Sequence, residues 1–371
     1  MMYGDNAGYP RIRSVLMTAD TVGGVWQYSI ELARYFCGHD IHVFLVTMGA
    51  LPDRAQRSEI ASLKHITLYE SSYKLEWMDD PWADVERAGA WLLDIQDAVN
   101  PQIVHLNGYS HGDLPWRVPV VVVGHSCVYS WFQSVCKTSP GPEWQTYKMR
   151  VERGLNSSNH VVAPSRAMLE WLQAIYQMKN TCSVIYNGCN SEIYKPLPKE
   201  PFVFTAGRIW DEAKNISTVI KCAGNSIWPV FIAGDAGKRE LTSVPNVKYM
   251  GKLESRKIAR VMGKASIYVA PCRYEPFGLS ILEAALCGCA LVLGDIESLR
   301  EIWGDSALFV DPGNSDCLSG KINLLIKNDH LRFEMSQKAR IRALEFSPGK
   351  MAIEYLSLYQ RLIEECKVIS L

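Results

Sequence analysis

The sequence has no excess of either charge, and this absence bears first on the partners of the protein. Of its 371 residues, 39 are Lys or Arg and 39 are Asp or Glu, so the formal net charge at pH 7 is zero. Proteins that bind nucleic acid through phosphate contacts normally carry a basic excess. We therefore expect no nucleic-acid partner. Residues 1–195 contain no polybasic stretch either, which leaves room only for weak peripheral contact with a membrane.

Long apolar runs and ordered cysteine spacings are also missing. No run approaches the roughly 20 apolar residues that a helix needs to cross a bilayer. The 11 cysteines include no C-x-x-C pair, and their number is odd, which is typical of free thiols in a reducing compartment. We expect a soluble, cytoplasmic protein without a transmembrane segment.

Several motifs that carry particular chemistries are absent as well. The sequence contains no Asp-x-Asp metal motif and no His/Cys cluster, so we expect no metal ion. It lacks the G-x-G-x-x-G dinucleotide fingerprint and the glycines of a Walker loop, so we expect no bound cofactor. There is no G-x-S-x-G elbow to expose the nucleophile of a hydrolytic triad.

Strand-like and helix-like runs alternate along the whole chain, as in parallel sheets with helices on both faces. A turn-rich stretch, residues 187–198, separates two such sets. We predict an α/β protein with two doubly wound domains, over residues 1–195 and 196–347, and a final helix within 348–371. Ligands bind beyond the carboxyl ends of such strands, so a cleft between the domains is expected. The expected strands are 15–18, 41–46, 103–106, 118–123, 160–163 and 182–186, then 202–205, 230–233, 247–250, 267–270, 290–293 and 307–310.

An acidic residue stands on either side of a helix start in the segment from Glu275 to Glu283. Pro276 suits the first turn of a helix, and Gly278 lets a ligand approach the backbone closely. The free N–H groups that follow form an anion site at the positive end of the helix dipole. Acids beside such a site repel phosphate but accept hydrogen bonds from hydroxyls. The pattern indicates a ligand with both groups, such as a nucleotide sugar. The alternative is an ordinary helix with a capping carboxylate.

This segment resembles the acid-x7-acid signature of the retaining nucleotide-sugar glycosyltransferases of family 4. These enzymes have the GT-B fold, in which two Rossmann-like domains face each other across a cleft. The resemblance implies that Glu275 binds hydroxyls of the transferred sugar, that Glu283 binds the ribose, and that the amides of Phe277 to Leu279 bind phosphate. It also implies that the final helix, within residues 348–371, crosses back to the first domain.

Two cations follow the first expected strand of the second half. Arg208 stands at its end and Lys214 six residues later. A diphosphate in a partly dry cleft requires cations, and charge-assisted hydrogen bonds there are stronger than neutral ones. Arg208 can bind phosphate bidentately, and Lys214 supplies a compact charge. In the resembling family, an arginine and a lysine at these positions clamp the donor diphosphate and stabilise the departing nucleotide. The alternative is two solvated loop cations.

Further strand ends offer additional donor contacts. Gly23 and Gly24 follow the first expected strand, where glycines allow phosphate to come close, although a purely structural turn fits equally well. His125 ends a run of valines and can donate a hydrogen bond to a sugar hydroxyl or polarise it. The resemblance places such a histidine near the 6-hydroxyl of the donor sugar. It also places Lys252 and Leu253 around the nucleotide base.

Tryptophans gather in the expected loops of the first half, among them Trp77, Trp82 and Trp131, with several carboxylates nearby. Aromatic faces stack on the C–H faces of sugars while carboxylates accept their hydroxyls, so we hypothesise an acceptor surface here. The alternative is that these rings are buried and contact no ligand. His105, on the strand before His125, is expected in the core or on the floor of the acceptor site.

Together these motifs predict a retaining hexosyltransferase, of the kind used in polysaccharide biosynthesis, that works without a metal. Its donor would be a UDP-, GDP- or ADP-sugar, and its acceptor a sugar, a glycan or a lipid-linked molecule. The resemblance implies front-face displacement with His125, Arg208, Lys214 and Glu275 as catalytic residues. Two alternatives stay open. One is a sugar-nucleotide epimerase or a phosphorylase on the same fold, and the other is a nucleotide-sugar sensor without turnover.

Overall fold

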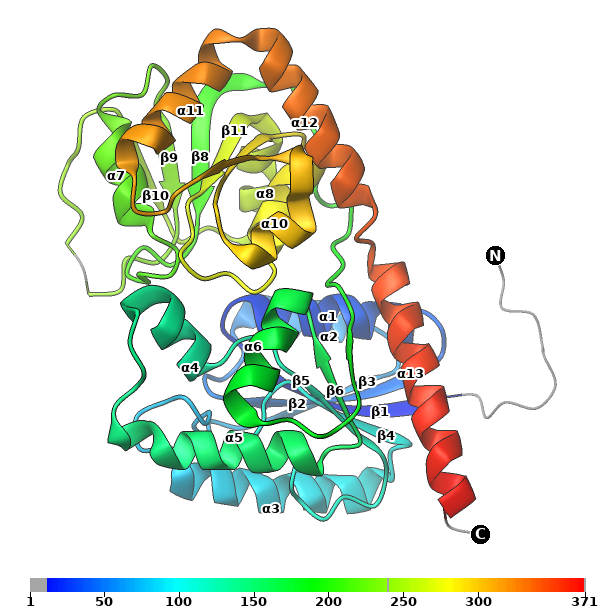
Figure 1. Ribbon diagram of the computed structural model, residues 1–371. Helices are drawn as coiled ribbons and strands as arrows, with labels where there is room; N and C mark the ends of the chain where they lie inside the picture. Colours follow the sequence, from blue (N-terminus) through cyan, green and yellow to red (C-terminus); the bar gives the residue numbers. More distant parts are fainter. Residues whose placement is uncertain (1–11, 239, 370–371) are drawn as a thin grey trace.

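Two parallel sheets form the framework of the protein. The computed structural model describes residues 12–238 and 240–369, so residues 1–11 of the expected first domain and residues 370–371 of the expected last segment lie outside it. Figure 1 shows two α/β domains, one above the other. The first sheet contains β1 (Ser14–Asp20), β2 (His42–Met48), β3 (Ile66–Glu70), β4 (Ile103–Leu106), β5 (Val120–Val123), β6 (His160–Ala163) and β7 (Cys182–Val184). The second contains β8 (Glu200–Ala206), β9 (Val230–Ala233), β10 (Val247–Gly251), β11 (Ala265–Ala270), β12 (Ala290–Gly294) and β13 (Leu308–Val310).

Strand order reverses once in each sheet. The first sheet has the order β3-β2-β1-β4-β5-β6-β7 and the second β10-β9-β8-β11-β12-β13, with parallel pairing throughout. The prediction of an α/β protein with two doubly wound domains is confirmed. Open parallel sheets bind ligands beyond the carboxyl ends of the strands at the point of reversal. The segments after β1 and β4, and after β8 and β11, are therefore the places where a site is expected.

Helices cover both faces of each sheet because side chains alternate along each strand. In β1, Val15 and Met17 belong to the apolar cluster on one face, and Leu16 belongs to the cluster on the other. The first-domain helices are α1 (Gly24–Cys37), α2 (Arg54–Ala61), α3 (Trp82–Val99), α4 (Val128–Trp131), η1 (Phe132–Cys136), η2 (Pro142–Trp144), α5 (Gln145–Ser157) and α6 (Arg166–Tyr176). Then come α7 (Ile216–Ala223), α8 (Ser255–Lys264), α9 (Leu279–Leu286), α10 (Glu297–Trp303), η3 (Gly304–Ser306), α11 (Ser315–Lys327), α12 (Asp329–Leu344) and α13 (Pro348–Ile369).

The last helix, α13, leaves the second domain and runs along the first (Figure 1). Its side chains Met351, Tyr355 and Tyr359 are almost fully buried and share an apolar cluster with Val15 and Met17 of β1. Because α13 begins beneath the second domain and completes the core of the first, it holds the two domains together. This link bears on the site because the site depends on how the domains face each other.

Polar groups also meet where α1 of the first domain packs near α9 of the second. Gln27 of α1 donates a hydrogen bond to the Glu283 carboxylate of α9, and Glu283 is only 5% exposed. Glu31, one turn further along α1, is buried too, and its Oε2 atom has no hydrogen-bond partner. Burial raises the pKa of each carboxyl to about 7, and the Glu31 charge adds to the rise at Glu283.

These two acids should make the stability of the protein depend on pH. Both have a folded-state pKa above the ordinary 4.5, so their contribution to stability is complete below about pH 4.5 and is lost as the pH rises through about 7. A rise of this size in one carboxyl pKa corresponds to about 3 kcal/mol. We expect Glu31→Gln to flatten the loss of stability between pH 5 and pH 8, measured by urea unfolding.

The control for this experiment is Glu170→Gln, which changes an exposed glutamate on α6. It should shift the unfolding free energy by a similar small amount at every pH. If the difference between wild type and Glu31→Gln did not grow with pH, the buried carboxyls would not be the cause.

Candidate active site between the domains

The loop after β11 is shaped by one glycine and one buried ring. Gly278 stands immediately before α9 with φ +92°, and a Cβ at this position would come within 2.8 Å of Ile281. Glycine therefore fits here better than any larger residue. Phe277 is 3% exposed and packs edge-on against Phe346 at 5.7 Å between ring centroids. These constraints fix the backbone from Pro276 to the first turn of α9.

Lys214 and Glu275 form an ion pair across two strand ends. Lys214 follows β8, Glu275 follows β11, and the lysine Nζ donates to a carboxylate oxygen of Glu275. Both side chains are mostly covered, with 24% and 11% of their surface exposed. Burial acts against the charged lysine, but the neighbouring Glu275 carboxylate outweighs it, so the pKa of Lys214 is raised. The ammonium group therefore remains charged in this site.

Arg208, a residue of the predicted diphosphate site, lies next to the first domain. Its Nε and Nη2 atoms donate to Asp211 at 3.2 and 2.7 Å. Its Nη1 atom lies on the side of the first domain, 3.5 Å from where a Cβ of residue 23 would stand. A Cβ on Gly24 would similarly lie 3.5 Å from Leu279 at the start of α9. The structure thus brings Gly23 and Gly24 against the donor-site residues of the second domain.

Asp20 also belongs to this group of residues around Arg208, although it was not predicted as a site residue from the sequence. It ends β1, and its carboxylate accepts a hydrogen bond from the amide of Val22 at 2.8 Å. Burial raises the pKa of Asp20 to about 6, while that amide and the charge of Arg208 act in the opposite direction. An acid just before a glycine pair at a strand end was the available signal for it. Gln27 gave no such signal, because its contact with Glu283 joins residues 256 positions apart.

His125 lies after β5 with one ring nitrogen already engaged. Its Nε2 atom is 2.8 Å from Oδ1 of Asn107. Since Asn107 uses its Nδ2 to donate to Thr18 and Ser29, Oδ1 accepts, and Nε2 of His125 carries the proton. Burial lowers the pKa of His125 to about 3, so the ring is neutral. Its Nδ1 atom is then free of a proton and can accept a hydrogen bond from a hydroxyl.

His105 lies in the core of the first domain. His105 is completely buried, and its Nδ1 atom is hydrogen bonded to the hydroxyl of Tyr359 on α13. Its Nε2 atom lies 3.2 Å from both Tyr28 and Asn107. Burial lowers the pKa of His105 to about 3. The first of the two locations expected for it, the core, is the one observed.

The remaining predicted residues make contacts of other kinds. Lys252 is exposed after β10, and within the described residues its side chain has no hydrogen bond or ion pair; Leu253 packs against the second-domain core. Trp77 is 49% exposed in the loop after β3. Trp82 begins α3 beneath the guanidinium of Arg150, and Trp131 ends α4 edge-on to Phe132. No ring contact joins the three tryptophans in the described part of the chain.

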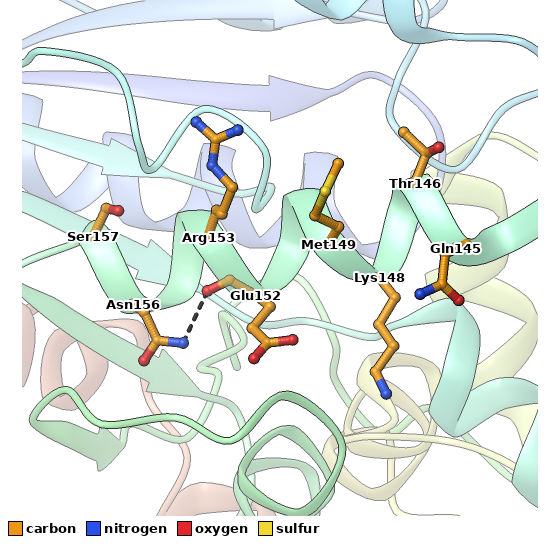
Figure 2. A pocket seen from close by; sticks show the side chains of 8 residues that line it. All are labelled: Gln145, Thr146, Lys148, Met149, Glu152, Arg153, Asn156 and Ser157. Carbon is orange, nitrogen blue, oxygen red and sulfur yellow. Dashed lines mark hydrogen bonds between the residues drawn. The ribbon is translucent and has the colours of Figure 1, made fainter.

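Two of the hollows among the described residues differ in character. One of about 250 Å³ lies between the domains and is lined by Glu275 and Pro276. The other, of about 810 Å³, is lined only by residues of α5, and α5 lies away from the second domain in Figure 1. Figure 2 shows that Lys148 and Glu152 point one way from this helix and Met149 and Arg153 the other. Side chains that diverge along one helix do not form a converging site.

Residues 12–238 and 240–369 contain no group of three or more His, Cys, Asp and Glu side chains placed to hold a metal ion. None of their helices combines the length and the apolar character needed to span a membrane.

Two protein-family models match adjoining parts of the chain. Residues 22–193 match "Glycosyltransferase Family 4", and residues 190–342 match "Glycosyl transferases group 1". The O-antigen chain mannosyltransferase B of Escherichia coli is 30% identical over 116 residues, 31% of this chain and 30% of that protein. An N,N'-diacetylbacillosaminyl-diphospho-undecaprenol alpha-1,3-N-acetylgalactosaminyltransferase of Campylobacter jejuni is 33% identical over 120 residues, 32% of this chain and 31% of that enzyme. The match thus spans about a third of the length of these relatives.

Solved structures resemble the chain over nearly its whole length. Sucrose-phosphate synthase from Thermosynechococcus elongatus has a TM-score of 0.79 at 16% identity, covering 95% of this chain and 100% of that one. Alr3699/HepE of Anabaena, solved in complex with UDP, has a TM-score of 0.74 at 18% identity, again covering 95% and 100%. The two family models, which together cover residues 22–342, show that the chain belongs to the family 4 glycosyltransferases. The shared architecture shows that it has the GT-B fold.

Proposed function

We propose that the protein transfers a sugar from a nucleotide-sugar donor to a hydroxyl acceptor in the cleft between its domains. The observation that carries this proposal is the meeting of strand ends from the two domains. Arg208, after β8, lies against Gly23, after β1, and Lys214 is paired with Glu275, after β11. His125 follows β5 of the first sheet, at the same edge as Gly23. Cations, helix amides and hydroxyl-binding groups are thereby concentrated where a sugar diphosphate requires all three.

The two cations would bind the diphosphate by different routes. Arg208 can keep its bonds to Asp211 and offer Nη1, which lies on the side of Gly23. Lys214 already holds Glu275, so phosphate would share the ammonium with that carboxylate. When the bond to the sugar breaks, negative charge grows on the leaving phosphate, and both cations stabilise it more than they stabilise the ground state.

The sugar would be held by Glu275 and His125. Glu275 accepts hydrogen bonds from hydroxyls, and the unprotonated Nδ1 of His125 accepts another. Because its pKa is about 3, His125 is a weaker base than a phosphate, so the leaving phosphate is the group that takes the proton of the acceptor. We propose on this basis front-face displacement with retention at the anomeric carbon, without a metal ion.

Relatives guide the choice of donor and acceptor to test first. The structures of Anabaena Alr3699/HepE were solved with UDP and with UDP-glucose. The Campylobacter relative is named for a diphospho-undecaprenol acceptor. We propose a UDP-sugar donor ahead of GDP- and ADP-sugars, and a sugar, glycan or lipid-linked acceptor. Release of nucleoside diphosphate, measured with and without acceptors, separates a transferase from an epimerase and from a sensor without turnover.

Ribose binding at Glu283 would require the domains to part. Glu283 is covered by Gln27 of the opposite domain, so the ribose can reach the carboxylate only after this hydrogen bond breaks. The Glu283 carboxylate would lose the hydrogen bond from the Gln27 amide and gain hydrogen bonds from the ribose hydroxyls, which are similar in kind. Donor binding is therefore coupled to a movement between α1 and α9.

Removing the charge of Lys214 should abolish most of the activity. Lys214→Met is expected to lower kcat by about 100-fold, because loss of one charged group that stabilises the leaving phosphate costs about 3 kcal/mol of the barrier. The measurement is UDP release from a UDP-sugar with acceptor present. Lys264→Met is the control, since Lys264 is an exposed cation paired with Glu200 at 2.7 Å on the same domain.

The paired acid needs its own control, because Lys214→Met leaves a mostly covered carboxylate without its partner. Lys214→Met/Glu275→Gln removes both charges and should keep the melting temperature closer to wild type while remaining inactive. Wild-type turnover by Lys214→Met would refute the assignment of the site.

Removing Gln27 should strengthen binding of the nucleotide. In Gln27→Ala the ribose no longer displaces a hydrogen bond from Glu283, so the Kd for UDP is expected to fall by about tenfold at most, the usual worth of one bond to a charged group. Isothermal titration calorimetry measures this Kd directly. Gln145→Ala, on the exposed face of α5, should leave it unchanged. Weaker UDP binding by Gln27→Ala would show instead that Gln27 assists the ligand.

A further inference from the structure

The cavity of about 250 Å³ beside Glu275 is lined by two cationic residues, Arg273 and Lys137. Arg273 is only partly exposed, and within the part of the chain that the structure describes its side chain makes no hydrogen bond and no ion pair. Lys137, on the opposite wall, is exposed, and its side chain likewise has no hydrogen bond or ion pair among the described residues. Arginine carries five N–H donors and stays charged, so a partly covered guanidinium without an acceptor marks a place where an anion would be stabilised.

The backbone around Arg273 is held on both sides. Its own amide donates to the carbonyl of Ala213 at 2.8 Å. The next residue, Tyr274, is 9% exposed, and its hydroxyl is hydrogen bonded to Ser130 of the first domain at 2.7 Å. The chain therefore has little freedom on either side of the guanidinium. Because the backbone that carries this cation is fixed, the site is preorganised for a ligand.

The acids that line the same cavity do not neutralise these cations. Glu275 is engaged with Lys214. Asp295 accepts two hydrogen bonds from Arg300, each of 2.6 Å. Glu297 is the remaining acid of the lining, and it is exposed at the start of α10. Two of the three acids are thus paired with cations that do not line the cavity, and the third faces the solvent.

This cavity is separate from the proposed diphosphate site, although the two adjoin. Arg208 and Lys214 do not line it, whereas Glu275 does. Its other wall comes from the first domain, where Gln133 and Lys137 contribute from η1 and the residue after it. A volume of about 250 Å³ is smaller than that of typical drug-sized pockets and suits a single small group. The ligand would thus lie on the far side of Glu275 from the diphosphate.

We propose that Arg273 and Lys137 bind a carboxylate or phosphate group carried by a substrate of the transfer reaction. This inference rests on the proposed function and specifies the substrate class. The oxyanion belongs either to the acceptor or to the transferred sugar, because both come next to Glu275. The first-domain wall favours the acceptor.

Matched substrate pairs distinguish these two sources. For the acceptor, glucose is compared with glucose 6-phosphate and with glucuronate, using UDP-glucose as donor. For the transferred sugar, hydrolysis of UDP-glucose is compared with that of UDP-glucuronate. In the wild type, one anionic substrate is expected to have a kcat/KM at least tenfold higher than its neutral counterpart, because hydrogen bonds between two charged groups are the strong ones. In Arg273→Met this preference should disappear while the neutral member is used as before.

Arg273→Lys and Arg117→Met complete the set of variants. Arg273→Lys keeps the charge and should retain part of the preference. Arg117 is an exposed arginine that is paired with Asp97 at 3.1 Å and does not line the cavity, so its loss should change nothing. An equal kcat/KM for both members of every pair in the wild type, or an undiminished preference in Arg273→Met, would overturn the inference.

A binding measurement decides the matter if none of these substrates turns over. With UDP at saturation, so that the diphosphate site is filled, inorganic phosphate should raise the melting temperature of the wild type and not that of Arg273→Met. No added shift in the wild type would reject the oxyanion site. If UDP, GDP and ADP themselves caused no shift, the proposed function would fail first, and this outcome is distinct from the other.

Discussion

The structure depends on one constraint, namely that parallel strands all end at the same edge of their sheet. Each sheet reverses its order once, beside β1 in the first domain and beside β8 in the second. The segments at these two reversals meet, because Arg208 after β8 lies against Gly23 after β1. Residues far apart in the sequence thereby form one group of charges. The helix α13, which completes the core of the first domain, helps to maintain this arrangement.

Most charged groups of the candidate site already have partners within the protein. Arg208 holds Asp211, Lys214 holds Glu275, and Glu283 accepts from Gln27. A substrate would therefore enter by exchange of hydrogen bonds, which keeps the buried charges compensated at every stage. Binding by exchange is weaker than binding to unpaired groups, but under the proposed function it would also ease release of the nucleotide product. Arg273 and Lys137 differ from these groups, since an anion in their cavity would form an ion pair without breaking one.

Much of the fold could be predicted because the strands are apolar and regularly spaced. The expected strands at 103–106, 160–163 and 230–233 coincide with β4, β6 and β9. The strand β3 was not predicted, since Ile66–Glu70 is a short edge strand whose side chains are partly exposed on both faces. Of the two strand-end histidines, the sequence could not assign His105 to the core alone, because the partner that buries it, Tyr359, is 254 positions away.

Glu275 connects the two parts of the cleft, and this position has a chemical consequence. Its carboxylate reduces the effective charge of Lys214 on the diphosphate side and borders the cavity of Arg273 on the other. Under the proposed function, a sugar hydroxyl that donates to Glu275 would weaken its hold on Lys214 and leave the ammonium available to the phosphate. An anion at Arg273 would act in the opposite sense on Glu275, because it would place negative charge beside the carboxylate. Occupation of one side would therefore change the electrostatics of the other, which would give a physical basis for ordering donor and acceptor within a single cleft.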